Sequence, residues 1–349
     1  MISPVWFLHW ATPLHSPSCK IGELFAQRAG VLPLVSFVVP VRNDVLHLQR
    51  CLASIAGNDY PRQLIEIIVV DHGSTDGSAL GAQAAGAVVL RGSGTSVAAL
   101  RNQGARAALG KIIAFVDADH EIDPRWITTA ADVLTDPSVA ATGAPYSPQP
   151  SPNWVQRQYD GLRRRPLSRE DVQWLGSGNF AVKRTVFERV GGFNASLTAC
   201  EDVDLCNRIR LAGHRIVADP NLRSMHFGDP KTLKALFFGE LWRGRDNLRV
   251  TFAGPLTFRD LRSALIPLGN LLCLAGAGVA MAFGYGVVAT TLVGISLVPA
   301  ALTAVVIVRR QLHRGIGTAV QAFAVAIVFD LARALALIAR GSHRARRVA

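Results

Sequence analysis

Short apolar runs alternate with helix-length amphipathic stretches over the first two thirds of the chain. The four clearest runs are Leu34–Val39, Ile65–Val70, Ala87–Leu90 and Ile112–Val116. Runs that are apolar almost throughout are typical of strands buried on both faces of a sheet. Strands that alternate with helices predict βα units around a largely parallel sheet. The pattern therefore predicts an α/β fold.

Helical periodicity fills two of the gaps between these runs. Val45–Ala56 places its apolar residues on one face, and Val97–Leu109 also has a helical pattern. Further along, the Pro- and Ser-rich stretch Pro145–Pro152 breaks the alternation. The Arg163–Arg165 run that follows is too polar for a core, so we expect an exposed loop or flap there.

Beyond Leu261 the pattern changes to three long hydrophobic stretches, Leu265–Phe283, Val287–Val308 and Ile316–Ile338. Each is close to the roughly 20 residues that a membrane-spanning helix needs. The first two predict a hairpin. In the third, Asp330 and Arg333 share a helical face, where we expect them to pair. This third stretch either spans the membrane or lies at its surface, because a third crossing would carry the basic C-terminus away from the cytoplasm.

These changes divide the chain into five parts. Residues 1–33 form an N-terminal extension without an assigned role, and residues 34–230 form the α/β domain. An amphipathic, interfacial linker covers residues 231–263, two or three transmembrane helices cover residues 264–339, and a basic tail covers residues 340–349. The cationic segment around Trp242 suits a membrane surface.

The formal net charge of +12 narrows the possible partners. Basic residues flank the apolar stretches, as in the cluster at residues 309–314 and in the C-terminal tail. This position favours membrane lipid headgroups, and no nucleic-acid module signature is present, so we expect no nucleic-acid partner. The five cysteines lack C-x-x-C spacing, which indicates neither a disulfide framework nor a zinc site.

Polar and acidic residues follow three of the predicted strands, where open α/β sheets bind their ligands. They are Pro40–Asp44, Asp71–Ser78 and Asp117–Asp119. If the extended backbone continues, Asp117 and Asp119 point to the same side, where the pair can hold one hard cation on a diphosphate. The alternative is a polar junction between a strand and a loop.

In order and spacing, the motifs from about Phe37 to His226 resemble the family 2 inverting glycosyltransferases of the GT-A fold. The motif residues are Phe37–Asp44, Val69–Gly77, Arg101–Gly104, Asp117–Asp119, Gly178–Arg184, Val190–Phe193 and Glu201–Leu205. The resemblance implies a GT-A nucleotide-diphospho-sugar transferase domain followed by helical membrane anchors. His72 departs from the family pattern, in which many members have an acidic residue or Asn, so a preference for uridine is not implied.

The resemblance also implies roles for individual residues. The nucleotide-binding candidates are Pro40, Arg42, Asp44, Asp71, Ser74 and Asp117. Asp119 is the expected ligand of a divalent cation, Mg²⁺ or Mn²⁺, and His226 is a second candidate, although a packed histidine is the alternative. Asp202 is the expected general base, because a neutral hydroxyl is a poor nucleophile. An acidic cap of the helix that follows is the alternative for Glu201–Asp202.

The expected function is transfer of a sugar from a nucleotide-sugar donor to a lipid-linked or glycan acceptor hydroxyl, with inversion. We expect it at the cytoplasmic face of the cell (inner) membrane, in envelope or surface-polysaccharide synthesis. A polyprenyl-phosphate acceptor is one alternative. A catalytically silent nucleotide-binding scaffold is another, against which the intact Asp119 and Asp202 argue.

Overall fold

The computed structural model describes residues 32–254, 258–311 and 315–339. The predicted basic tail, and all but the last two residues of the predicted N-terminal extension, lie outside these ranges. All elements below belong to one compact unit that begins at Leu34.

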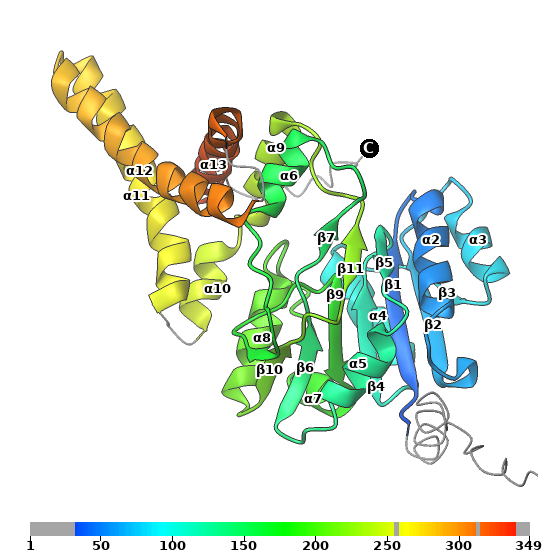
Figure 1. The fold of residues 1–349 in the computed structure, drawn as a ribbon. Coiled ribbons are helices and arrows are strands. Elements are labelled where there is room, and N and C mark those ends of the chain that lie inside the picture. Colours follow the sequence, from blue (N-terminus) through cyan, green and yellow to red (C-terminus); the bar gives the residue numbers. More distant parts are fainter. Residues whose placement is uncertain (1–31, 255–257, 312–314, 340–349) are drawn as a thin grey trace, which may run out of the picture. The chain divides into compact units, whose positions relative to one another are not determined.

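The central element is an eight-stranded mixed sheet (Figure 1). Its spatial order is β3 (Val88–Arg91), β2 (Ile65–Asp71), β1 (Val35–Val41), β4 (Ile112–Val116), β9 (Asn179–Lys183), β6 (Val139–Gly143), β10 (Arg215–Ala218) and β8 (Glu170–Asp171). Strands β3, β2, β1 and β4 are parallel. Strand β9 lies antiparallel between β4 and β6, and β8 is an antiparallel edge strand. The four predicted strands are confirmed, with small differences at their ends.

A second, three-stranded sheet brings distant parts of the sequence together. Its order is β5 (His120–Ile122), β11 (Ser224–His226) and β7 (Ser147–Pro148). Strand β11 pairs antiparallel with β5, so that His226 lies opposite His120. This small sheet continues the chain beyond the end of β4 and positions the site described below.

Helices pack on both faces of the main sheet. The helices of this domain are α2 (Val45–Ala56), α3 (Ser78–Ala84), α4 (Val97–Ala107), α5 (Trp126–Val133), α6 (Trp154–Asp160), α7 (Arg184–Arg189) and α8 (Glu201–Leu211), with a 3₁₀ turn at Arg62–Leu64. One hydrophobic core joins the sheet to buried residues of α4, α7 and α8. On the other face, the ring of Phe37 contacts that of Trp126, with centroids 5.6 Å apart.

The close approach of α4 to the sheet depends on Gly104. A Cβ at this position would lie 2.4 Å from Val38 Cγ1, which is far inside van der Waals contact. The helix begins at Ser96, whose Oγ accepts a hydrogen bond from the backbone of Ala99. It ends at Ala107, two residues before the predicted end, because Ala108 has an extended backbone.

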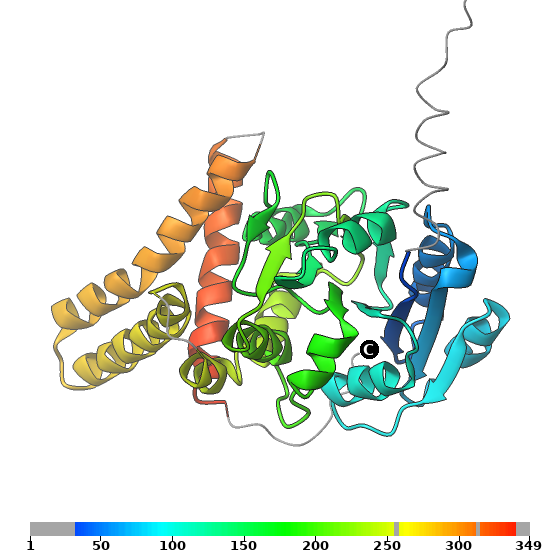
Figure 2. The same cartoon turned by 90° about the horizontal axis from the view of Figure 1, so that it is seen from below.

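The C-terminal part is helical and consists of α9 (Leu233–Arg243), α10 (Asn247–Ala253), α11 (Phe258–Ala282), α12 (Gly286–Arg310) and α13 (Ile316–Ala336). Within the described ranges, α11, α12 and α13 are long and apolar enough to cross a membrane. Helices α11 and α12 pack together as the predicted hairpin, whereas α13 also packs against α9 and α6 (Figure 2).

A buried ion pair joins α13 to α9. Arg333 Nε donates to Glu240 Oε2 at 2.8 Å, and the Glu240 side chain is 1% exposed. Tyr159 of α6 donates its hydroxyl to the other oxygen of Glu240 at 2.7 Å. The predicted pairing of Arg333 with Asp330 was therefore wrong, because Arg333 finds its carboxylate on α9, a partner that helical spacing alone does not reveal.

Candidate active site

The loops that follow β1 and β2 are joined by hydrogen bonds at the carboxyl edge of the sheet. The backbone N–H of Asn43 donates to Ser74 Oγ at 2.9 Å, and Asn43 Oδ1 accepts from the backbone of Thr75 at 2.7 Å. The buried carboxylate of Asp71 accepts from the backbone of Ser74 at 3.1 Å. Two nucleotide-binding candidates, Asp71 and Ser74, therefore lie together in an ordered loop.

The other candidates from the first motif lie at the end of β1. Pro40 belongs to the strand, and Arg42 follows it with an exposed side chain. Asp44 precedes α2, and its Oδ1 contacts His47 Nδ1 at 2.7 Å. These residues share one sheet edge with Asp71 because β1 and β2 are parallel and in register. Their role in nucleotide binding stays a prediction.

The backbone turns immediately after β4. The N–H of His120 donates to the carbonyl of Asp117 at 3.1 Å, so the strand does not continue through the motif. Asp117 Oδ1 accepts from Arg101 at 2.6 Å, whereas Asp119 Oδ2 lies 3.2 Å from His226 Nε2. The extended backbone therefore does not continue from Asp117 to Asp119, and the turn gives the two carboxylates different partners.

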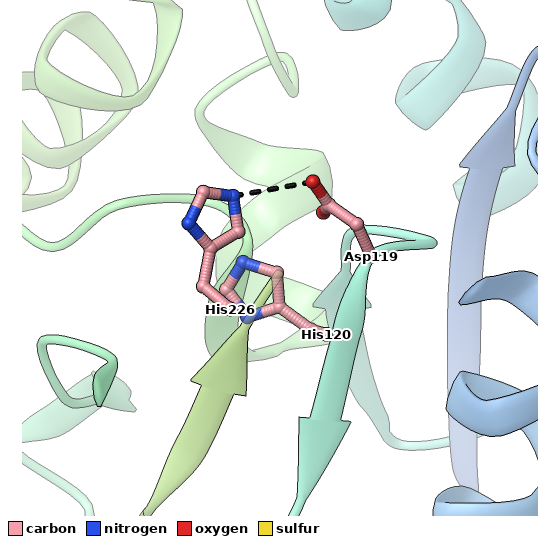
Figure 3. A group of neighbouring side chains, drawn as sticks. All are labelled: Asp119, His120 and His226. Atoms are coloured by element: carbon pink, nitrogen blue, oxygen red, sulfur yellow. Dashed lines mark ion pairs between the residues drawn. The ribbon is translucent and has the colours of Figure 1, made fainter. Parts of the chain in front are cut away.

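Asp119, His120 and His226 form a compact group (Figure 3). Each offers one ligand atom, and these three atoms lie within 4.8 Å of one another. Such a separation suits ligands that share one cation, and carboxylate oxygens and imidazole nitrogens are common metal ligands. The two predicted metal ligands, Asp119 and His226, are therefore adjacent. His120 joins them as a residue that the sequence reasoning missed.

The pKa values in this group reflect burial and mutual charge. Burial alone would raise the pKa of Asp119, but the hydrogen bond and charge of His226 outweigh it and hold the pKa below its ordinary range. Burial alone would lower the pKa of His226, but its bonds to Asp119 and Asp229 raise it to about 9. Burial, with the neighbouring charge of His226, lowers the pKa of His120 to about 4. His120 is therefore neutral at pH 7.

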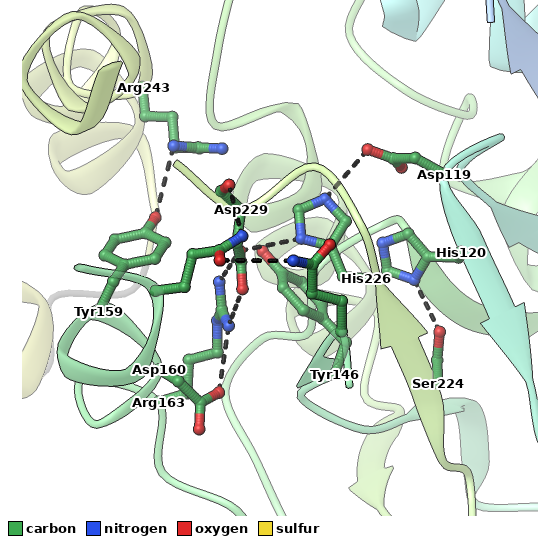
Figure 4. A network of polar contacts seen from close by, with 12 residues as sticks. Asp119, His120, Tyr146, Tyr159, Asp160, Arg163, Ser224, His226, Asp229 and Arg243 are labelled. Atoms are coloured by element: carbon green, nitrogen blue, oxygen red, sulfur yellow. Dashed lines mark hydrogen bonds and ion pairs between the residues drawn. The ribbon is translucent and has the colours of Figure 1, made fainter. Parts of the chain in front are cut away.

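Behind His226 lies a buried network of charged residues (Figure 4). His226 Nδ1 contacts Asp229 Oδ1 at 2.9 Å, and Asp229 is held by both terminal nitrogens of Arg163. The Arg163 guanidinium also lies over the ring of Tyr146, 4.1 Å from its centroid. The Arg163 side chain is only 12% exposed, so the predicted exposed loop is wrong at this residue. A buried carboxylate, Asp229, explains why an arginine is tolerated here.

Arg101 links the end of β4 to the start of α8. Its Nη1 donates to Glu201 Oε1 at 2.8 Å, and its other terminal nitrogen donates to Asp117. Arg101 is 3% exposed, and its two carboxylate partners outweigh the effect of burial and raise its pKa. The guanidinium is therefore a permanent positive charge that brings the two acidic motifs into one site.

Asp202, the predicted base, lies in the first turn of α8 next to Glu201. Its Oδ1 accepts the N–H of Val203 at 2.8 Å, and a Cβ on Gly176 would lie 3.9 Å from its Oδ2. Cys200, directly before the helix, has a φ of 60°, which is uncommon for a residue other than glycine and is often found near functional sites. Burial, followed by the charge of Glu201, raises the pKa of Asp202 to about 7.

Residues 36–193 match the model of glycosyl transferase family 2. Glycosyltransferase AglE of Haloferax volcanii is 27% identical in an alignment that covers 60% of this chain and 70% of AglE. The pre-mycofactocin glycosyltransferase of Mycobacterium tuberculosis is 32% identical over 53% of this chain, which spans 41% of that protein.

Among the solved structures that resemble this chain, one with a high coverage illustrates the fold. It is the mannosyltransferase PcManGT from Pyrobaculum calidifontis, in complex with GDP-Man and Mn²⁺. The similarity covers 89% of this chain and 94% of that protein, with a TM-score of 0.57 and 21% identity. The fold is therefore GT-A, followed by a helical region. The domain that contains residues 36–193 belongs to glycosyl transferase family 2.

Proposed function

We propose that the protein transfers one sugar from a nucleotide-sugar donor to a hydroxyl of a lipid-linked or glycan acceptor, with inversion at the anomeric carbon. The observation that carries this proposal is the position of Arg101 between Asp117 and Glu201. It joins the acidic motif after β4, expected to face the donor diphosphate, to the helix start that holds Asp202. Two distinct acidic groups are thereby available in one site.

The two groups meet two different chemical demands. A carboxylate at Asp202 removes the proton from the acceptor hydroxyl as the oxygen attacks the sugar, and a pKa near 7 suits a general base at neutral pH. A divalent cation held by Asp119 and His226 would neutralise charge on the departing nucleoside diphosphate. The nucleotide itself is assigned to the joined loops that contain Pro40, Arg42, Asp44, Asp71 and Ser74.

A screen of purified full-length protein tests the donor assignment. Nucleoside diphosphates with Mg²⁺ or Mn²⁺ are added, and a ligand that binds only the folded state raises its melting temperature. We expect the nucleoside diphosphate of one nucleobase to stabilise the protein in the presence of metal, and the matching nucleotide sugar to support transfer. Absence of binding and transfer with every donor would support a silent scaffold instead.

The acceptor is tested separately. A lipid-linked sugar offers a hydroxyl, which needs the base, whereas a polyprenyl phosphate offers an oxygen that is already ionised. We expect Asp202→Asn to lose transfer to a hydroxyl acceptor. Full activity of this variant with polyprenyl phosphate would identify the phosphate as the acceptor and exclude a hydroxyl-transfer mechanism.

We also propose that the domain lies at the cytoplasmic face of the cell (inner) membrane, in envelope or surface-polysaccharide synthesis. The hairpin of α11 and α12 begins and ends on one side of a bilayer if both helices cross it. Its basic end at Arg310 contacts the carbonyl of Gly161 in the catalytic domain at 3.1 Å. Basic residues at this end favour the cytoplasmic side.

A further inference from the structure

His120 is a buried histidine with one ring nitrogen left free. It is 1% exposed, and its Nδ1 lies 2.7 Å from Ser224 Oγ. Within the described residues, its Nε2 has no hydrogen-bond partner. A buried polar atom without a partner is unfavourable, so this nitrogen calls for a ligand or another compensation.

The surroundings of both histidines direct Nε2 toward the same place. The Ser224 hydroxyl can accept the Nδ1 proton of His120, and Asp229 can accept that of His226 at 2.9 Å. In the neutral form of each ring this leaves the Nε2 lone pair for a ligand, which is the usual arrangement of metal-binding histidines, and at His226 a cation would take the place of the Nε2 proton. His226 Nε2 is already 3.2 Å from the carboxylate of Asp119.

Aromatic packing holds the two rings in place. The ring of Tyr146 lies against both, with its centroid 5.0 Å from that of His120 and 4.5 Å from that of His226. Tyr146 is in turn covered by the guanidinium of Arg163 (Figure 4). This packing restricts the orientation of both imidazole rings and of their nitrogen atoms.

We propose that His120 is a third protein ligand of the cation, together with Asp119 and His226, and that the two imidazoles make the site select transition-metal ions over Mg²⁺. This inference rests on the metal-dependent function proposed above. Mg²⁺ strongly prefers oxygen ligands, whereas imidazole nitrogen favours transition metals in the order Mn²⁺ below Co²⁺. The affinity should therefore rise from Mg²⁺ to Mn²⁺ to Co²⁺.

Metal titrations of the full-length protein test the proposal. Mg²⁺, Mn²⁺ and Co²⁺ are titrated by calorimetry in the presence of the stabilising nucleoside diphosphate, and the visible absorption of bound Co²⁺ reports its nitrogen ligands. We expect His120→Asn to weaken the binding of Mn²⁺ and Co²⁺ by about tenfold or more and the binding of Mg²⁺ by less. The spectrum of bound Co²⁺ should also change. His214→Asn is the matched control, because His214 also has an unpaired Nε2 but lies outside the group.

Each outcome separates this proposal from the one on which it rests. If His120→Asn keeps the Co²⁺ spectrum and the preference for Mn²⁺ over Mg²⁺, His120 is structural and the inference is wrong. Loss of binding in Asp119→Ala would still support the metal site itself. If the wild-type protein binds none of the three ions, both proposals fail. If His120→Asn does not fold, Ser224→Ala replaces it as the test, because it keeps the His120 ring and removes only its hydrogen-bond partner. We expect Ser224→Ala to weaken Mn²⁺ binding by a smaller factor.

Discussion

The backbone of Gly228 passes so close to Asp119 that a Cβ at this glycine would lie 2.1 Å from Asp119 Oδ2. The same Cβ would lie 2.9 Å from His226 Nε2. Real Cβ atoms essentially never make contacts this short, so a side chain at residue 228 would force Asp119 or His226 to move. The glycine thereby keeps free the space next to two of the proposed metal ligands.

We therefore expect Gly228→Ala to abolish Mn²⁺ binding, because the methyl group displaces Asp119 or His226. Calorimetric titration with Mn²⁺ and a nucleoside diphosphate measures the effect. The matched control is Gly278→Ala in α11, where a Cβ meets nothing within 4 Å. Unchanged Mn²⁺ affinity in the Gly228 variant would place the cation elsewhere.

Replacing Asp202 by Asn nearly preserves its size and removes the proton acceptor. General-base assistance is worth about 10²–10⁴-fold, so kcat should fall by that order while the nucleotide Kd changes little. Asp204→Asn is the control from the same helix turn, because Asp204 pairs with Arg208 at 2.6 Å. We expect this control to stay within a few-fold of wild type. Weakened nucleotide binding with a normal kcat in Asp202→Asn would instead make Asp202 a donor-binding or structural residue.

The raised pKa of Asp202 also predicts two effects of pH. The kcat should rise with pH through about 7, as the carboxylate forms. An unfolded Asp titrates near about 3.9, so the proton on Asp202 stabilises the folded protein fully below that pH, and this contribution is lost as pH rises through about 7. Between about pH 5 and pH 8, the free energy of unfolding should therefore fall less in Asp202→Asn than in the wild-type protein. An equal loss in both proteins would contradict the raised pKa.

Glu240 should contribute strongly to stability because it is buried between two helices. Glu240→Ala leaves Arg333 without its carboxylate, and breaking a buried pair costs about 3–5 kcal/mol. The exposed pair of Glu188 with Arg184 provides the control, and Glu188→Ala should cost less than about 1 kcal/mol. Denaturant unfolding in detergent compares the two variants. Similar losses would show that α13 is held by apolar packing alone.

Cysteine labelling of intact cells tests the proposed orientation. In a variant without the five native cysteines, single cysteines are placed at Tyr285 and at Arg310. We expect a membrane-impermeant reagent to label position 285 and not position 310. Labelling at 310 alone would reverse the orientation of the hairpin.

Local sequence patterns predicted the parallel half of the sheet because each of its strands is a continuous apolar run. They also predicted which loops carry acidic residues. They did not predict the partners of those residues, which depend on contacts between distant segments. His120 meets Ser224 through the pairing of β5 with β11, and each of these strands is only three residues long. Such short strands have no periodicity to detect.

The sequence left the turn after β4 undecided for a related reason. Two carboxylates at alternate positions are typical of a continuing strand, and nothing in Asp117–Asp119 itself marks the turn. Arg101 was visible as a motif residue, but its partners Asp117 and Glu201 are 16 and 100 residues away. A direct signal did exist for Asp229, which follows His226 by three residues and is the carboxylate that faces its second ring nitrogen.

The ion pair of Glu240 with Arg333 limits how the C-terminal helices can be removed or replaced by those of a related protein. A chain that stops after α9 keeps Glu240 but lacks Arg333, and thereby exposes the surface of α6 and α9 that α13 covers. Helix α13 is therefore not an interchangeable anchor. In a chimera whose last helix comes from another glycosyltransferase, the donor helix must supply a cation at position 333, or Glu240 must be replaced together with it.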